Sequence, residues 1–142
     1  MYIKSQLFKT LTSNKIYSPV GYYSSAIKIN CGTYSIVHSS GFIGIDPKTN
    51  RLVSDNVEEQ AKMALNNLKN LFNDNNISFN NIAKVTLFLT NMNDFNKVNE
   101  IYHQFINNDN NNNNNYPARS CVEVSNLPKN AKFEIEAIAY LF

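Results

Sequence analysis

The side chains best suited to chemistry lie near the C-terminal end of the chain. The stretch "YPARSCVEV", Tyr116 to Val124, places Arg119 and Cys121 on a segment that alternates like a β-strand, and Glu134 follows on the next such segment. A guanidinium can pair two N–H groups with both oxygens of a carboxylate, and a glutamate can orient water and accept its proton. On this pattern alone, an arginine beside glutamates is more often a partner in a structural ion pair, and binding of a small carboxylate is the alternative.

Histidines and cysteines give little support to other chemistries. His38 and His103 are far apart on different predicted elements, and Cys31 and Cys121 have neither metal-ligand spacing nor a CxxC pair. We therefore expect no metal site, no cofactor and two free thiols in a reducing compartment, with a Cys31–Cys121 disulfide as the alternative. No histidine or aspartate accompanies Cys121 in a recognisable motif, which argues against a covalent thiol mechanism.

Length and composition indicate one domain. The chain of 142 residues is 43% hydrophobic, has a formal charge of +2, and has no apolar run approaching the ~20 residues of a membrane span. We expect a single soluble domain over residues 1–142, with a short N-terminal extension at 1–16 and an asparagine-rich loop at 107–115. The extension has lysines and hydroxyl residues without acids, as transit peptides do, but it lacks arginine. The expected location is cytoplasmic, with a mitochondrion or plastid as the alternative.

Hydrophobic periodicity predicts an α+β fold. The predicted strands are 26–30 and 33–45, joined by a turn at Cys31-Gly32, and then 83–89, 119–124 and 132–140. The predicted helices are 57–72, beginning with a capping box of Asp55 and Glu58, and 94–106. Because the order is β-β-α-β-α-β-β, we expect a two-layer sandwich of one mixed sheet with both helices on one face.

Two layers leave one face of the sheet without helices. In the last two strands the apolar residues belong under the helices, which predicts a polar set on the open face, namely Arg119, Cys121, Glu123, Glu134 and Glu136. A sheet face with charges at its centre either meets water or meets other subunits in a polar interface with pockets.

Three segments together resemble a known family. "YPARSCVEVSNLPKNAKFEIEAIA", "SSGFIGIDPKTN" and "NDFNKVNEIY" are similar to the reactive intermediate deaminase family, also called YjgF or RidA and once labelled L-PSP endoribonucleases. The resemblance runs from about Val20 to Ala139. It implies a chorismate-mutase-like fold assembled as a homotrimer, with sites in the clefts between subunits. It also implies hydrolysis of 2-imino acids such as 2-iminobutanoate and 2-iminopropanoate to 2-keto acids and ammonia.

The resemblance reverses the preference for a structural ion pair and implies roles for Arg119, Glu134 and Cys121. Arg119 matches the arginine that binds the substrate carboxylate, and Glu134 matches the glutamate to which the family assigns the water. Cys121 matches a position whose backbone contacts substrate, so its thiol need not react. Glu123 and Glu136 are expected to be structural partners of Arg119, Lys132 or a neighbouring chain.

Further candidate substrate-binding residues come from upstream segments. Tyr23 matches an aromatic residue that reaches the cleft from a neighbouring subunit, and Ser40, Gly41 and Phe42 match a strand that supplies backbone donors. Phe42 stands where many members have glutamine, so we expect a narrower or more apolar pocket. Asn99 falls on the apolar stripe of the second helix and should be hydrogen-bonded inside the fold.

Other functions remain open. The older family label suggests an RNA-cleaving or translation-inhibiting protein, but the predicted open face has as many acids as bases, which does not suit phosphate binding. A non-catalytic sensor of small carboxylates would use Arg119 without Glu134. The preferred imine is not determined by these residues.

Overall fold

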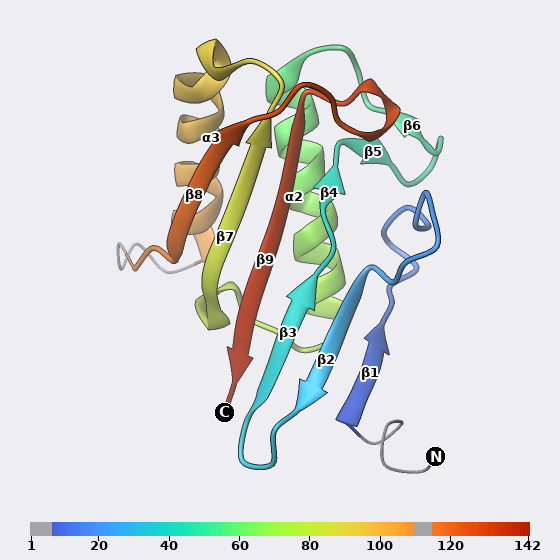
Figure 1. Ribbon diagram of the computed structural model, residues 1–142, viewed down its shortest axis with the longest axis vertical. Coiled ribbons are helices and arrows are strands. Elements are labelled where there is room, and N and C mark those ends of the chain that lie inside the picture. The colour runs from blue at the N-terminus through green and yellow to red at the C-terminus, as the bar shows by residue number, and fades with distance from the viewer. Residues whose placement is uncertain (1–6, 110–114) are drawn as a thin grey trace.

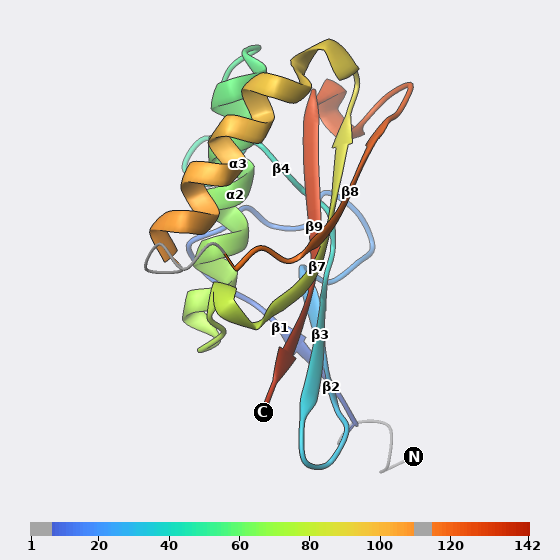
Figure 2. The same cartoon turned by 90° about the vertical axis from the view of Figure 1, so that its left-hand side faces the viewer.

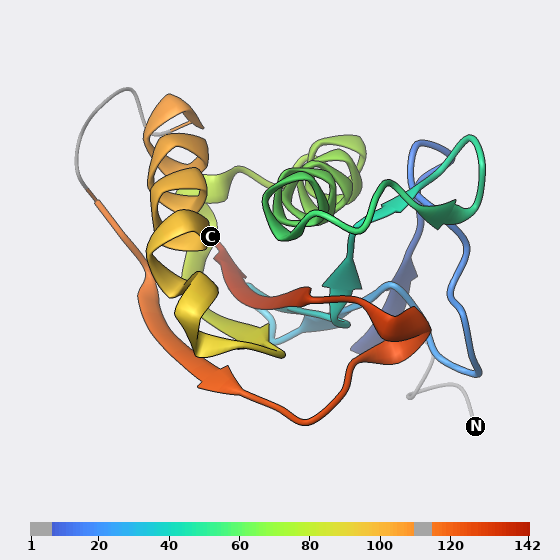
Figure 3. The ribbon, with the colours of Figure 1, turned by 90° about the horizontal axis from the view of Figure 1, so that it is seen from above.

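The computed structural model describes residues 7–109 and 115–142 and has an α+β architecture (Figure 1). The helices α2 (Val57–Asp74) and α3 (Phe95–Asp109) lie on one side of a mixed sheet, and neither lies on the other side (Figure 2). Seen from above, both helices lie on the same side of the sheet (Figure 3). The predicted two-layer sandwich is confirmed.

The main sheet has the strand order β1-β2-β3-β9-β7-β8, and β4 also pairs with β9. Its strands are β1 (Phe8–Leu11), β2 (Ala26–Asn30), β3 (Ser35–Ser39), β4 (Phe42–Ile43), β7 (Ile82–Leu89), β8 (Ala118–Glu123) and β9 (Phe133–Leu141). The short strands β5 (Ile45–Asp46) and β6 (Arg51–Leu52) form a separate antiparallel pair. Within the main sheet β7 and β8 are parallel, because α3 connects them as a crossover, whereas the other pairs are antiparallel.

The core lies between the helices and the central strands. On β9 the alternate residues Phe133, Ile135, Ala137 and Ala139 are at most 2% exposed, as the alternation predicts. The buried face of α2 includes Ala61, Ala64, Leu65, Leu68 and Phe72, which follow the predicted helical spacing. Because β9 lies between β3 and β7 in the sheet, its faces are well defined: one packs in the core and the other is open.

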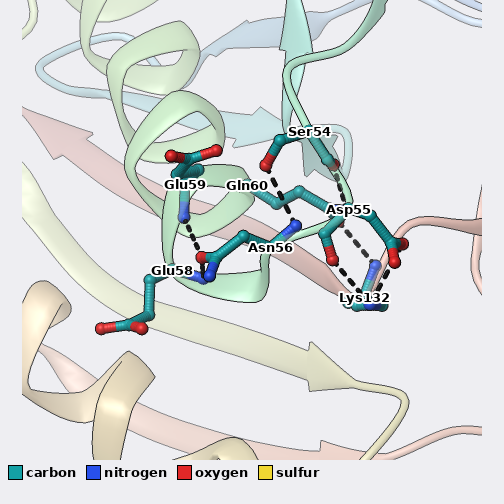
Figure 4. A network of polar contacts seen from close by, with 7 residues as sticks. All are labelled: Ser54, Asp55, Asn56, Glu58, Glu59, Gln60 and Lys132. Atoms are coloured by element: carbon teal, nitrogen blue, oxygen red, sulfur yellow. Dashed lines mark hydrogen bonds and ion pairs between the residues drawn. The ribbon is translucent and has the colours of Figure 1, made fainter.

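Helix α2 begins at Val57, as predicted, but its N-cap residue differs from the predicted one. Asn56, and not Asp55, is the N-cap: its Oδ1 accepts hydrogen bonds from the backbone N–H groups of Glu58 at 2.8 Å and Glu59 at 3.1 Å (Figure 4). Asp55 instead forms an ion pair with Lys132, with 3.0 Å between Nζ and Oδ1. The predicted capping box of Asp55 and Glu58 is therefore wrong, because Asn56 provides the capping oxygen and Asp55 has a tertiary partner.

The same network ties the start of α2 to the start of β9. Gln60 is fully buried, and its side chain donates to the carbonyl of Ser54 and accepts from the backbone N–H of Lys132, both at 2.8 Å (Figure 4). Lys132 directly precedes β9. This satisfied buried amide fixes the position of the strand that presents Glu134.

The predicted continuous strand 33–45 is interrupted. The β2–β3 hairpin turns at Cys31-Gly32 as expected, with Gly32 at φ 91°, but β3 ends at Ser39 and the chain bends at Ser40 and Gly41 before β4. Ser40 donates from its hydroxyl to the carbonyl of Ser24 at 2.6 Å and from its N–H to the carbonyl of Ser25 at 2.9 Å. These bonds hold the bend, which ends the first pairing and starts the pairing of β4 with β9.

Two other predicted segments also differ from the structure. Residues Phe8–Leu11 of the predicted N-terminal extension form β1, which pairs with β2, and Leu11 and Ile16 are buried in the core. Helix α3 continues through Asp109, so the predicted loop at 107–115 starts inside a helix, and 110–114 lie outside the described residues. No helix in the described parts of the chain has the length and apolar character to cross a membrane.

Candidate active site

The strand register places Arg119 and Glu134 on opposite faces of the sheet. Arg119 on β8 lies opposite Val85 on β7, which in turn lies opposite Ala137 on β9. Val85 and Ala137 are buried in the core, so Arg119 points to the helix side. Glu134 directly follows the buried Phe133 and therefore points to the open side.

The predicted open-face set is thus confirmed for β9 and wrong for β8. Arg119, Cys121 and Glu123 lie on the helix side, whereas Val122 lies on the open side and is 41% exposed. The physical reason is that β8 is an edge strand. An edge position does not force its apolar residues under the helices, and its helix side is accessible enough for a guanidinium.

Helix α3 holds Arg119 through one amide and two aromatic rings. Nη1 of Arg119 donates to Oδ1 of Asn99 at 2.8 Å, and its Cζ lies 5.1 Å from the ring centroid of Tyr102 and 5.6 Å from that of Phe95. The expectation that Asn99 is hydrogen-bonded inside the fold is confirmed. We call Phe95, Asn99, Tyr102 and Arg119 the arginine half-site.

Much of the Arg119 fork remains free. Among the described residues it forms no ion pair with Glu123, whose carboxylate instead accepts from the backbone N–H of Met92 at 2.5 Å. The other guanidinium N–H groups have no hydrogen-bond partner within the described parts of the chain. Arg119 is therefore positioned by the protein but keeps donors for an anionic ligand.

An open hollow of about 550 Å³ lies beside the arginine half-site. It is lined by Asn99, Glu100, Tyr102, His103, Tyr116, Pro117 and Arg119. Nδ1 of His103 is 2.6 Å from the Tyr116 hydroxyl, and that hydroxyl also bonds Oδ1 of Asn107 at 3.1 Å, which closes one wall. Sequence reasoning missed His103 and Tyr116, although helical spacing from Asn99 to His103 and the proximity of Tyr116 to Arg119 were available signals.

Cys121 is half-buried on the same side as Arg119. Burial raises the pKa of its thiol, and the charge of Arg119 opposes this shift only in part. A protonated thiol is a poor nucleophile. The geometry is thus in keeping with a role for the Cys121 backbone and not for its sulfur.

Glu134 lies on the open side of the sheet, in an environment unlike that of Arg119. It is half-buried, and burial raises the pKa of its carboxyl, with the charge of Glu136 on the same face adding to the rise. Within the described residues its carboxylate has no hydrogen-bond or ion-pair partner. The carboxylate lies against Gly41, where a Cβ would come within 2.0 Å of Oε1, so any larger residue at this position would displace the Glu134 side chain.

Tyr17 lies near both Glu134 and Tyr23. The buried Tyr17 accepts a hydrogen bond from the backbone N–H of Ile43 at 3.1 Å, and burial raises its pKa to about 12, with smaller contributions from the neighbouring Tyr23 and Glu134. Tyr23 is 43% exposed, and its hydroxyl accepts from the backbone N–H of Val20 at 3.2 Å. We call Tyr17, Tyr23, Gly41 and Glu134 the glutamate half-site. Tyr17 was not predicted, since nothing in its local sequence marks it.

Two predicted backbone-donor positions have other structural roles. Phe42 is only 2% exposed, lies opposite Ile135 in the core and packs edge-on against Tyr17, with 6.0 Å between ring centroids. The expectation that Phe42 narrows a pocket is therefore wrong in this protomer, because β4 turns its side chain inward. The N–H of Ser40 already donates to Ser25.

The two half-sites cannot meet within one protomer. Strands β8 and β9 are separated by β7, which places them about 10 Å apart at ~4.8 Å per strand, and the two side chains leave opposite faces of the sheet. No group of three or more metal-ligating side chains is present in the described portion of the chain. Each half-site therefore offers part of a site: one a positioned cation, the other an unpaired carboxyl.

The chain is similar over most of its length to proteins of one family. The family model described as Endoribonuclease L-PSP matches residues 12–141. The human protein named 2-iminobutanoate/2-iminopropanoate deaminase is 36% identical over 137 residues, covering 96% of this chain and 93% of that protein. Two solved Escherichia coli structures, TdcF with bound serine and the YjgF gene product, are 37% and 36% identical. Each has a TM-score of 0.81, covering 92% of this chain and 97% of its own.

Proposed function

Because the chain belongs to the endoribonuclease L-PSP family, also called YjgF or RidA, we propose that it hydrolyses 2-imino acids such as 2-iminobutanoate and 2-iminopropanoate. Relatives that are about one-third identical are named as deaminases of such compounds, which supports an enzyme of this family. The single observation that carries the proposal to this chain is the pair of complementary half-sites. One offers a free arginine fork for a carboxylate, and the other a half-buried carboxyl for water.

In the proposed reaction, Arg119 binds the substrate carboxylate with its free N–H groups. Glu134, as the carboxylate, accepts a proton from water while the water oxygen bonds to C2 and the C=N electrons move to nitrogen, which gives a carbinolamine. The protonated Glu134 then returns its proton to nitrogen. The C2 hydroxyl then gives its proton to Glu134, which passes it to the nitrogen as the C–N bond breaks and the C=O bond forms, so that ammonia and the 2-keto acid leave. A raised pKa suits Glu134 to both steps, because proton transfer is most effective when the pKa is near the working pH.

We also propose that the active unit is a homotrimer in which Arg119 of one subunit meets Glu134 of a neighbour. The helix-free face supports this arrangement, since it carries the apolar residues Ile27, Ile29, Ile36, Ile138, Tyr140 and Val122. An apolar face of this kind favours association. Because the two half-sites are on different surfaces, their contact would be head-to-tail, and a rotation of about 120° between subunits would close three of them into a ring.

The direct test of the reaction is a coupled assay. A threonine dehydratase generates 2-iminobutanoate, and the release of ammonia and 2-ketobutanoate is followed with and without this protein. Faster release that requires Glu134 supports the proposal, whereas release at the buffer rate overturns it. Light scattering at micromolar protein tests the assembly, for which a monomer mass is the contradicting result.

RNA cleavage is the alternative to be measured on the same preparation. The central strands of the open face carry Glu134 and Glu136 against Lys84, which does not favour phosphate contacts. RNA binding through phosphates weakens steeply with salt, while hydrolysis of a small imine should be insensitive to moderate salt. Salt-sensitive RNA cleavage that depends on Arg119 would count against the deaminase.

A further inference from the structure

The hydroxyl of Tyr102 is buried without a hydrogen-bond partner. The side chain is 3% exposed, and among the described residues only this oxygen and Oδ1 of Asn67 are buried side-chain polar atoms with no partner. Buried tyrosine hydroxyls usually have a partner, because burial removes the hydrogen bonds that water would make. The unpaired hydroxyl therefore suggests a partner that the free protomer does not contain.

Tyr102 and Asn67 lie in different parts of the fold, and only Tyr102 lines the hollow beside Arg119. The Asn67 side chain already donates to the carbonyl of Ile45 at 2.8 Å, in the core between α2 and β5. Tyr102 lines the hollow beside Arg119, with 5.1 Å between the Arg119 Cζ and its ring centroid. Burial raises the pKa of Tyr102 to about 12, against the opposing effect of the Arg119 charge, so the hydroxyl keeps its proton and can donate it in a hydrogen bond.

We propose that the Tyr102 hydroxyl donates a hydrogen bond to the carboxylate bound by Arg119, which makes Tyr102 a further substrate-contacting residue. The ligand class rests on the proposed function: small 2-imino or 2-keto acids with an ionised carboxylate. Asn99 holds one side of the guanidinium and the Tyr102 ring supports its face. The Tyr102 hydroxyl then donates to the carboxylate, and no acceptor among the described residues competes for its proton.

The test is Tyr102→Phe, which keeps the ring and removes the hydroxyl. We expect KM to rise and kcat/KM to fall about tenfold with kcat nearly unchanged, because a hydrogen bond to a charged group is lost in ground and transition states alike. The melting temperature should stay the same or rise by up to about 4 °C, since an unpaired buried hydroxyl is removed. By contrast, Tyr17→Phe should lower the melting temperature, because the N–H of Ile43 loses its acceptor. Tyr34→Phe, an exposed position on the β2–β3 hairpin, is the matched control and should change neither quantity.

Calorimetric binding of 2-oxobutanoate separates this inference from the proposed reaction. A tenfold weaker binding to Tyr102→Phe supports the contact, even if the wild-type protein releases no ammonia, in which case only the proposed reaction fails. Unchanged KM and unchanged 2-oxobutanoate affinity overturn the contact and leave the deaminase standing. A lower melting temperature with loss of activity in proportion to the folded fraction also overturns it, because the hydroxyl would then have a structural partner.

Discussion

The arginine half-site and the glutamate half-site differ in how well the protein supports the charge of each functional side chain. Arg119 is fixed by Asn99 and two rings and keeps donors free, so its charge is supported before any ligand arrives. Glu134 is half-buried beside Glu136 with no donor to its carboxylate in the described residues, so its negative charge is unsupported. Neither half is sufficient alone, and in the proposed trimer the preformed anion site of one subunit would complement the half-buried acid of another.

The largest expected effect comes from removing the proposed base. Glu134→Gln keeps the size of the side chain but cannot accept a proton, so kcat should fall about 10²-fold with the trimer intact. The coupled ammonia-release assay and light scattering together measure this. Glu136→Gln, two residues along the same strand, is the matched control and should change kcat by no more than a few-fold. Equal losses in both variants would mean that the face requires negative charge and not one base.

Mixing variants tests whether the half-sites belong to different subunits. Arg119→Ala and Glu134→Gln chains, each nearly inactive, are co-expressed with different tags and purified as mixed trimers. If each cleft takes Arg119 from one subunit and Glu134 from the next, every mixed trimer has one intact cleft in three, and activity should recover to about one third of the wild-type value. Each variant alone serves as the baseline. No recovery in verified mixed trimers would place both residues of a cleft in one protomer.

A smaller effect is expected from changing the geometry of the cation. Arg119→Lys keeps the charge but loses the planar fork, so KM should rise and kcat/KM should fall about tenfold or more while kcat changes less. Arg51→Lys, on the exposed strand β6, is the matched control and should leave KM and kcat unchanged. If Arg119 were only a structural ion-pair partner, Arg119→Lys and Glu134→Gln would instead share a loss of stability with residual activity tracking the folded fraction. Full activity in Arg119→Lys would rule out two-pronged binding.

The smallest effect concerns stability and pH. The pKa of Glu134 is raised in the folded state, so between its unfolded and folded pKa values the folded chain binds more protons and the free energy of unfolding falls as pH rises. Glu134→Gln removes this penalty. The variant should therefore melt slightly above the wild type at pH 7.5, and the difference should shrink as pH falls to about 4. Thermal melts across this range measure it, and a variant that melts lower at pH 7.5 would show that the carboxylate is stabilised by an unidentified partner.

Local pattern predicted much of what surrounds the site. The alternation of Phe133, Ile135, Ala137 and Ala139 placed Glu134 on the open face, because β9 lies inside the sheet and only one of its faces can be apolar. The stripe on α3 likewise predicted that Asn99 would be hydrogen-bonded inside the fold. These predictions succeed because burial on a central element leaves a residue few alternative orientations.

Tertiary structure decided the features that depend on a neighbour. At the edge strand β8, alternation does not say which face is covered, and only the pairing with β7 turned Arg119 towards α3. The bend at Ser40 and Gly41 turned Phe42 into the core, and the ion pair with Lys132 left the N-cap to Asn56. Periodicity alone predicted the two helices, the central strands, the two layers and the acid on the open face. Which face holds the arginine depends on strand pairing between distant segments, and periodicity within one segment carries no information about that.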